Sequence, residues 1–279
     1  MGGGNRICSN CLGRFFTVFL ADAMPRTIDA AILTYHSISG GAAPLCIAPD
    51  VFASQMTWLK QNANVIPLKL LVESLVHGRS LPPRTVALTF DDGFTDFYSE
   101  AAPVLRLLGL PAIVFLPADY CGRFASWAPP GEGQPIMSWV QTQELAAQGM
   151  SFGSHGMRHL VLTSETDAEI SFEMAESKKL IEAKIGREIH FFCYPYGCYD
   201  ERSRRTAAAY YSGGACSTDL RKLAAVEDRF ALPRIDVHYL RSFAIFQSMF
   251  TERFRLYLCA RGVLRKLNSR IRRAKQEAD

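Results

Sequence analysis

Apolar runs and helix-like patterns alternate along this chain. Runs typical of buried strands occupy residues 30–35, 85–90, 111–116, 150–154, 189–194 and 230–237. Between them, apolar side chains recur at helical spacing, most clearly over residues 165–185. That helix is expected to bury Ile170, Met174, Leu180, Ile181 and Ile185. Strands that alternate with helices favour a parallel α/β sheet or barrel.

Several helix boundaries and one long loop can also be placed. Phe52, Met56 and Leu59 follow helical spacing, and Asp50 is the candidate N-cap before them. Gly109 and Gly149 are expected to end two further helices. Residues 117–138 have the composition of a loop, which is long enough to cover an active site.

Residues with chemically active side chains follow the predicted strands. Those that stand at or just after strand ends are His36, Asp91, Asp92, His155, Tyr196 and His238. In a barrel of parallel strands these ends converge on one face, where active sites are built. The sequence therefore predicts one site made from several strand ends.

A metal site is expected among these residues. His155 and His159 are four residues apart, so a helix face or a tight turn could bring both imidazoles together, and Gly156 between them favours the turn. Two neutral imidazoles and one carboxylate suit Zn²⁺ or a related metal, with one position left for water. Only one residue of the Asp91-Asp92 pair is needed as a ligand, which leaves the other as a general base. Alone, Asp-Asp-Gly is most often a turn, and His-x-x-x-His is often a solvated helix face.

Composition is that of a soluble globular enzyme. Of the 279 residues, 48% are hydrophobic and 21% are charged. No stretch approaches the roughly 18 apolar residues that cross a bilayer. The formal net charge of +4 is uneven, because residues 253–279 contain nine basic and two acidic groups while the other 252 residues have a net charge of −3.

The basic segment has helical periodicity. Such a helix either packs on the barrel and ends in a solvated tail, or lies on an anionic membrane surface. No recognition motif accompanies the charge, so nucleic-acid binding is not expected. We therefore divide the chain into an N-terminal extension at residues 1–29, a catalytic domain at 30–252 and a basic C-terminal helix at 253–279.

Cysteine usage and the N-terminus favour a cytoplasmic location. Eight cysteines are scattered along the chain, and a reducing compartment leaves them as small buried apolar residues. Cys8 and Cys11 are spaced as metal ligands, but no second pair accompanies them, which favours two thiols. The apolar run at residues 15–20 is short for a signal peptide and ends at Asp22, so no cleaved leader is expected. The basic segment can place such a protein at the inner face of the membrane.

Taken together, the motifs resemble those of the polysaccharide deacetylases, carbohydrate esterase family four, which share the nodulation-factor deacetylase homology domain. Thr-Phe-Asp-Asp-Gly at 89–93 resembles the first motif, Ser-His-x-x-x-His at 154–159 the second, and Phe-Cys-Tyr-Pro-Tyr-Gly at 192–197 the third. Further similar stretches lie at 33–36, 137–139 and 232–235, so the resemblance spans roughly residues 30–240.

This resemblance implies a distorted (β/α) barrel that hydrolyses the acetyl group of an N-acetylated sugar. By position, it assigns Asp91 as the general base and Asp92, His155 and His159 as ligands of a divalent metal, with Zn expected and Co, Ni, Mn or Fe as alternatives. It also implies that the metal and the backbone N–H of Tyr196 hold the oxyanion.

The chain departs from the family pattern at two points. Many members have an arginine in the third motif, where it orients the catalytic aspartate, and Arg234 is the candidate to supply that charge here. The family's general acid is a histidine in a Leu-x-x-x-His motif, but Leu232 is six residues before His238. His238 is the first candidate for the acid and His36 the second.

Aromatic residues near the long loop are candidates for sugar contact. Trp127 is the stronger one, and Trp139 is equally well explained as a core residue at the start of a helix. Tyr196 and His36 complete the expected substrate-binding set.

The function expected from the sequence is metal-dependent removal of N-acetyl groups from an amino sugar, in a polysaccharide or a lipid-linked saccharide, during synthesis of a surface glycan. One alternative keeps the fold but changes the bond, as in an O-acetyl esterase or a deformylase of a lipid-linked sugar. Another is a carbohydrate-binding pseudoenzyme.

Overall fold

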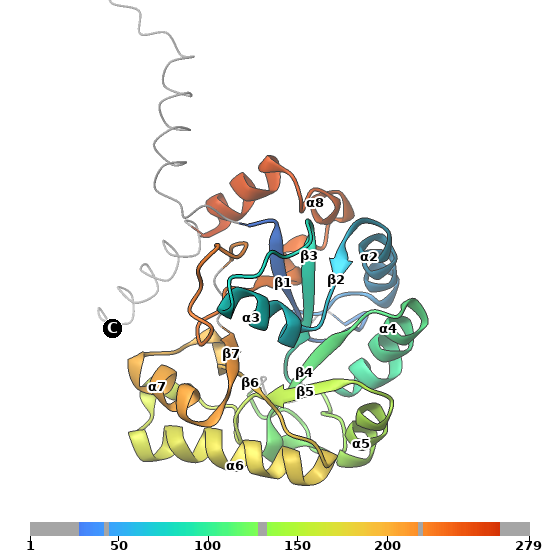
Figure 1. Ribbon diagram of the computed structural model, residues 1–279. Coiled ribbons are helices and arrows are strands. Elements are labelled where there is room, and N and C mark those ends of the chain that lie inside the picture. The colour runs from blue at the N-terminus through green and yellow to red at the C-terminus, as the bar shows by residue number, and fades with distance from the viewer. Residues whose placement is uncertain (1–27, 42–44, 128–132, 217–219, 263–279) are drawn as a thin grey trace, which may run out of the picture.

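The computed structural model describes residues 28–41, 45–127, 133–216 and 220–262. In these residues one curled parallel sheet has the strand order β7-β6-β5-β4-β3-β1-β8, and β2 also pairs with β3 (Figure 1). The predicted α/β fold class, a distorted (β/α) barrel, is confirmed. Its strands are β1 (Ala30–Tyr35), β2 (Asn64–Val65), β3 (Thr85–Phe90), β4 (Ala112–Leu116), β5 (Ser151–Ser154), β6 (Phe191–Cys193), β7 (Gly213–Cys216) and β8 (Ile235–Asp236).

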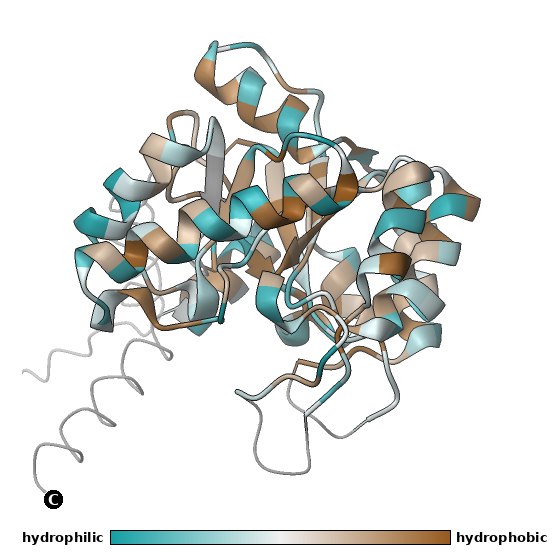
Figure 2. Cartoon of the chain, turned by 90° about the horizontal axis from the view of Figure 1, so that it is seen from below, coloured by the Kyte–Doolittle hydropathy of each residue, from teal (hydrophilic) through white to brown (hydrophobic). Residues whose placement is uncertain are grey.

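Helices follow most of the strands and cover the sheet. The α-helices are α2 (Pro49–Asn62), α3 (Leu68–Val76), α4 (Ala102–Leu108), α5 (Trp139–Ala147), α6 (Asp167–Ile185), α7 (Glu201–Tyr210) and α8 (Phe243–Gln247). Single turns are η1 (Phe97–Ala101), η2 (Ala118–Tyr120), η3 (Leu162–Ser164), η4 (Pro195–Gly197) and η5 (Val237–Leu240). Figure 2 shows hydrophobic strands at the centre and helices of mixed hydropathy around them.

Strand alternation sorts the side chains into two apolar clusters. In β1, Ala31, Leu33 and Tyr35 join the large outer cluster with the buried faces of α2, α4, α5 and α6. Ala30 and Ile32 join a smaller inner cluster, where α3 covers the inner face of the sheet. The inner positions become polar toward the strand ends, since the hydroxyl oxygens of Thr34 and Thr89 lie 3.0 Å apart. The next inner position after Thr89 on its strand is Asp91, and alternation alone therefore directs its carboxylate inward.

Two expected boundaries were wrong. The predicted strand at 230–237 is reduced to β8, which pairs with β1 only at Ile235 and Asp236. Pro233 has no N–H for a sheet ladder, and a turn at Asp228–Ala231 precedes it. Asp50 lies inside the first turn of α2 rather than at its N-cap, which is Ala48, because Pro49 takes the first helical position.

The predicted helix at 165–185 corresponds to α6, which buries Ile170, Met174 and Ile181 and half-buries Leu180 and Ile185.

Only parts of the two predicted terminal segments fall within the described residues. Residues 252–262 are helical and bury Phe254 and Leu258 against the outer cluster, as a packing helix would. The remainder of the basic segment, residues 263–279, and the Cys8–Cys11 pair lie outside the described residues. In the part of the chain that the structure describes, none of the helices has the length and apolar character needed to span a membrane.

Replacing Gly153 in β5 tests how tightly the sheet is packed next to the site. An added Cβ would lie 2.6 Å from Cε1 of Phe115 and 2.8 Å from the carbonyl oxygen of Phe191. We expect Gly153→Ala to lower the free energy of unfolding by about 1–3 kcal/mol, as overpacking does, measured by urea denaturation. Gly40→Ala is the matched control because open space surrounds that position. Equal stability of the two variants would contradict this packing.

Candidate active site

Asp91 and Arg234 form a buried ion pair on the inner side of the barrel. Arg234 Nη1 donates to Asp91 Oδ1 over 2.8 Å and Nη2 donates to Oδ2 over 2.7 Å, with side chains 1% and 4% exposed. The same guanidinium lies 3.2 Å from Oγ1 of Thr89 and 3.0 Å from Sγ of Cys193. The two parallel hydrogen bonds fix the orientation of the carboxylate.

Arg234 controls the protonation of Asp91. Burial alone would raise the pKa of this carboxyl group, but the charge and the hydrogen bonds of Arg234 outweigh burial and hold the pKa well below its ordinary range. Asp91 is therefore ionised at neutral pH. The structure places Arg234 where the sequence suggested it could act, and the same guanidinium also contacts Cys193 of the third-motif stretch, which has no arginine.

The second carboxylate faces two imidazoles. Asp92 Oδ1 is 3.2 Å from Nε2 of His159 and 3.5 Å from Nε2 of His155. One ligand atom from each of the three residues lies within 4.8 Å of the others, and all three residues are buried. Burial alone would raise the pKa of Asp92, but contact with His159 outweighs it and lowers the pKa. Asp92 therefore faces both imidazoles, while Asp91 is held by Arg234 and also lies near His155.

The donor set fits a divalent metal. Asp92 Oδ1 is buried without a hydrogen-bond partner. Nδ1 of His155 lies 2.8 Å from the carbonyl oxygen of Cys193, so Nδ1 carries the hydrogen and Nε2 keeps its lone pair. Burial lowers the pKa of His155 to about 4, which leaves the imidazole neutral at pH 7. One carboxylate and two imidazoles are a ligand set that suits Zn²⁺ and related metals.

The site residues are held in strained backbone conformations. In the described chain five non-glycine residues have positive φ, and three of these are Asp92 (67°), His159 (58°) and Tyr196 (59°). Such conformations persist where the surrounding structure holds them, and they cluster at functional sites. The turn that the sequence favoured for His155 and His159 is present, with Gly156 at φ 82°.

Aromatic rings enclose His159. Trp127 stacks on its imidazole with centroids 4.0 Å apart, and Tyr196 packs against it at 4.7 Å. Tyr120 supports Trp127 at 5.0 Å. The predicted substrate candidate Trp127 thus lies directly beside the metal-ligand group. Trp139 instead begins α5, where Lys184 lies over its ring at 5.9 Å, so its place is structural.

The two candidate general acids differ in position. His36 Nε2 is 3.8 Å from Oδ2 of Asp91. His238 is on η5, where its backbone N–H donates to Asp236 over 2.8 Å. Burial and then the charge of Arg241 lower the pKa of His238. His36 is therefore the histidine that the structure brings to the base.

One residue that the sequence analysis missed contacts the metal-ligand turn. Glu173 on α6 has no exposed side-chain surface, and it accepts hydrogen bonds from the turn between His155 and His159. The available signal was its spacing, because Glu173 lies three and four residues from the buried Ile170 and Ser177 on one face of the helix. An acidic residue in such a stripe indicates a specific buried partner.

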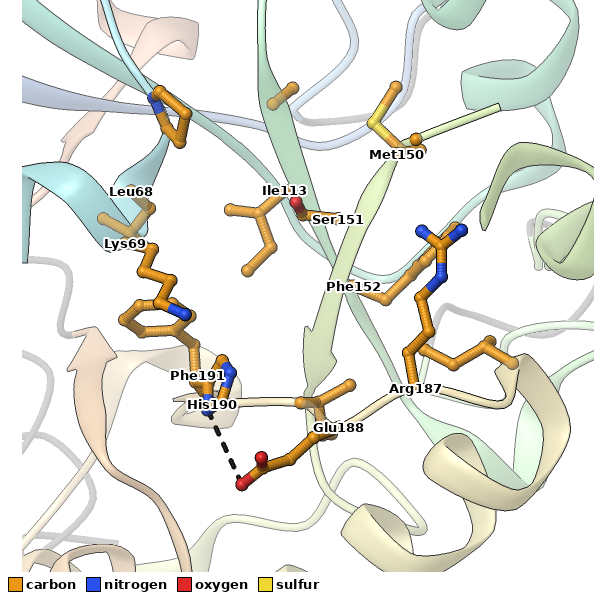
Figure 3. A pocket seen from close by; sticks show the side chains of 15 residues that line it. Leu68, Lys69, Ile113, Met150, Ser151, Phe152, Arg187, Glu188, His190 and Phe191 are labelled. Carbon is orange, nitrogen blue, oxygen red and sulfur yellow. Dashed lines mark ion pairs between the residues drawn. The ribbon is translucent and has the colours of Figure 1, made fainter. Parts of the chain in front are cut away.

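A separate hollow lies at the other end of the sheet. It has a volume of about 140 Å³ and lies at the starts of β4, β5 and β6, next to Lys69 of α3. Figure 3 shows Arg187, Glu188 and His190 around it, with the His190–Glu188 ion pair at 3.7 Å. None of the predicted site residues is among those that line it.

Comparison with known proteins shows the family of this chain. The family model described as polysaccharide deacetylase matches residues 78–211. Over 214 residues the chain is 31% identical to YxkH of Bacillus subtilis (strain 168), a protein named as a polysaccharide deacetylase, and the match covers 74% of this chain and 70% of that protein. His36, Arg234 and His238 lie outside the span of the family model.

Two further proteins are similar to this chain, one over part of its sequence and one in its fold. The poly-beta-1,6-N-acetyl-D-glucosamine N-deacetylase of Escherichia coli (strain K12) is 28% identical over 114 residues, which are 39% of this chain and 14% of that protein. The structure of IcaB from Ammonifex degensii superposes with a TM-score of 0.67 at 24% identity, covering 76% of this chain and 93% of that chain. At this identity the second similarity supports the barrel fold.

Removing Arg234 should expose the dependence of Asp91 on its partner. We expect Arg234→Met to lower the free energy of unfolding of the metal-free protein by about 3–5 kcal/mol at pH 7, because a buried carboxylate is left unpaired. Without Arg234, burial raises the pKa of Asp91 in the folded variant above its unfolded value of about 3.9, and the resulting penalty is lost as the pH falls and the carboxyl group becomes protonated. The deficit of the variant should therefore shrink toward pH 4, as measured by urea denaturation. The double variant Asp91→Asn/Arg234→Met should recover part of the loss, and a pH-independent deficit would refute the account.

Proposed function

The chain belongs to the polysaccharide deacetylase family, and from this premise we propose that it removes N-acetyl groups from an amino sugar of a polysaccharide by metal-dependent hydrolysis. Membership makes it a hydrolase of carbon–nitrogen bonds. The metal dependence, the sugar and the residue roles are the proposed parts. The name of the E. coli relative supports an N-acetylglucosamine polymer as the substrate to test first.

The observation that carries the proposal is the separation of two adjacent carboxylates. Arg234 binds both oxygens of Asp91, which also lies within 4.8 Å of a ring nitrogen of His155, whereas Asp92 faces both His155 and His159. The proposed base is thereby kept out of the metal coordination shell, and the proposed ligand is kept away from Arg234, although the two residues are neighbours in the chain. This arrangement matches the role of each residue that the family resemblance implies.

In the proposed reaction, Asp91 accepts the proton of the attacking water. Because Arg234 keeps it ionised, Asp91 is ready at neutral pH, but its low pKa also makes it a weak base. Asp92, His155 and His159 would hold a divalent metal, which when bound would lower the pKa of water and polarise the acetyl carbonyl.

The remaining roles are protonation of the leaving group, stabilisation of the oxyanion and contact with the sugar. His36 donates a proton to the leaving amine nitrogen, because it lies 3.8 Å from Asp91 and so on the same side of the site. The backbone N–H of Tyr196, held at φ 59°, stabilises the oxyanion. Tyr196, with its side chain about half exposed, and Trp127 offer ring surface to the sugar.

The alternatives gain no specific support. The site geometry alone does not discriminate an N-acetyl from an O-acetyl or a formyl group, and the family comparisons favour the deacetylase. The complete set of carboxylates and histidines, with Arg234 in place of the third-motif arginine, argues against a pseudoenzyme. The lipid-linked substrate, the membrane contact of residues 253–279 and the cytoplasmic location remain predictions from the sequence.

Separate variants of the two aspartates should give different losses. We expect Asp92→Ala to lose both metal and acetate release, whereas Asp91→Asn should keep the metal and lose turnover by roughly 10²–10⁴-fold, as expected for a general base. Metal content of the purified protein and acetate release from an N-acetylglucosamine oligomer are the measurements. The roles would be wrong if Asp91→Asn lost the metal and Asp92→Ala kept it.

A matched pair of histidine variants should identify the general acid. We expect His36→Gln to reduce kcat by roughly 10²-fold or more, and His238→Gln to have a much smaller effect. The loss in His36→Gln should be smaller for a substrate whose leaving group needs no protonation, such as an aryl acetate. A larger loss of kcat in His238→Gln than in His36→Gln would instead identify His238 as the general acid.

A further inference from the structure

Four successive backbone N–H groups, those of residues 155–158, are engaged in the turn that carries the two proposed metal-ligand histidines. The N–H of His155 donates to Leu116 O over 2.8 Å, and that of Gly156 donates to Ser154 Oγ over 3.0 Å. The N–H groups of Met157 and Arg158 both donate to Oε2 of Glu173, over 2.8 and 2.9 Å. Half of this anchoring therefore comes from a single side chain on α6.

Glu173 is a buried charge with a defined set of partners. Its other oxygen, Oε1, accepts from Nε of Arg158 over 2.7 Å, and its side chain has no exposed surface. Arg158 is 38% exposed and also pairs with Glu169. A buried carboxylate is tolerated when charged and backbone donors satisfy it, and all the donors named here come from the histidine turn.

The helix that carries Glu173 is itself fixed relative to the strand that carries His155. Ser177 of α6 and Ser154 of β5 are joined by a hydrogen bond of 2.6 Å between their hydroxyl groups. Tyr211 donates to the carbonyl oxygen of Met174 over 2.8 Å. Glu173 therefore reaches the turn from a fixed position.

The close fit leaves no room for a side chain at Gly156. A Cβ at Gly156 would lie 2.9 Å from Oε2 of Glu173, and the φ of Gly156 is 82°. His159 follows with a φ of 58°, a conformation that needs support from its surroundings. Glu173 supplies support at the two residues before it.

We propose that Glu173 is a positioning residue that sets the spacing of the His155 and His159 imidazoles and thereby the affinity of the metal site. This rests on the proposed function, because it assumes that these imidazoles and Asp92 hold a metal. Glu173 touches no ligand atom of the site. It acts through the two backbone N–H groups and through Arg158.

A merely structural role would show itself differently. In that case Glu173 would stabilise the packing of α6, and its loss would lower the melting temperature without changing the histidine turn. The test therefore needs readouts that report on the turn and on the metal separately from global stability.

The experiment compares Glu173→Gln with Glu169→Gln in the full-length protein. Glu169→Gln is the matched control. It weakens the ion pair of Arg158 with residue 169 but leaves the contacts of Glu173 to the turn intact. Co²⁺ affinity is measured by competition with a chelator, and the visible absorption of bound Co²⁺ reports its coordination. Hydrogen exchange of residues 155–161 is measured in metal-free protein, well below the melting temperature. Glu173→Asp serves as a second variant if the glutamine variant does not fold.

We expect Glu173→Gln to weaken Co²⁺ binding about 10-fold or more, as loss of a group that orients a ligand does, to alter the absorption spectrum and to speed exchange at 155–161. Glu169→Gln should leave all three unchanged, and Glu173→Asp should give a smaller loss than Glu173→Gln. Unchanged affinity and exchange in Glu173→Gln would overturn this inference while leaving the proposed function intact. Absence of Co²⁺ binding in the unaltered protein would instead overturn the proposed function and this inference together.

Discussion

The buried ion pair between Asp91 and Arg234 is the constraint on which the rest of the site depends. Both side chains are almost fully buried, and each would be costly to bury alone. Together with Thr89 and Cys193 they satisfy one another on the inner side of the barrel. Because Arg234 binds both oxygens of Asp91, the proposed metal-ligand role falls to the neighbouring aspartate. Asp92 has a positive φ, and its carboxylate faces the two histidines.

The barrel provides the two environments by simple geometry. Alternation along β3 directs Asp91 to the inner side, where Arg234 meets it, and the strand ends immediately afterwards. Beyond the strand ends the backbone is irregular, and the proposed metal ligands lie there, where Glu173 of α6 binds the histidine turn and Trp127 stacks on His159. A rigid strand thus places the proposed base, while anchored turns place the proposed ligands. This division explains why the positive-φ residues gather beyond the strands.

Much of this arrangement could be predicted from the sequence, because strand runs and strand-end residues have strong local signals. The 85–90 and 165–185 elements and the convergence of Asp91, Asp92, His155 and His159 follow from patterns that span a few residues. Arg234 and Asp91 are 143 residues apart in the chain. The sequence could therefore show only that the third motif lacks an arginine and that Arg234 was a candidate to replace it. Glu173 was missed because a glutamate in a helix is usually exposed, and its spacing from the buried Ile170 and Ser177 was the only local signal to the contrary. The last strand was overestimated because Pro233 and the turn before it override an apolar pattern.

The most direct test is a crystal structure of the Co²⁺- or Zn²⁺-loaded protein, with anomalous diffraction recorded at the absorption edge of the metal. The account predicts one peak, about 2.0–2.2 Å from an oxygen of Asp92 and from Nε2 of His155 and His159. Asp91 should remain bound to both nitrogens of Arg234 and stay out of the coordination shell. A peak coordinated by Asp91, or no peak at these residues in metal-saturated crystals, would contradict the central claim that Arg234 separates the base from the metal ligands.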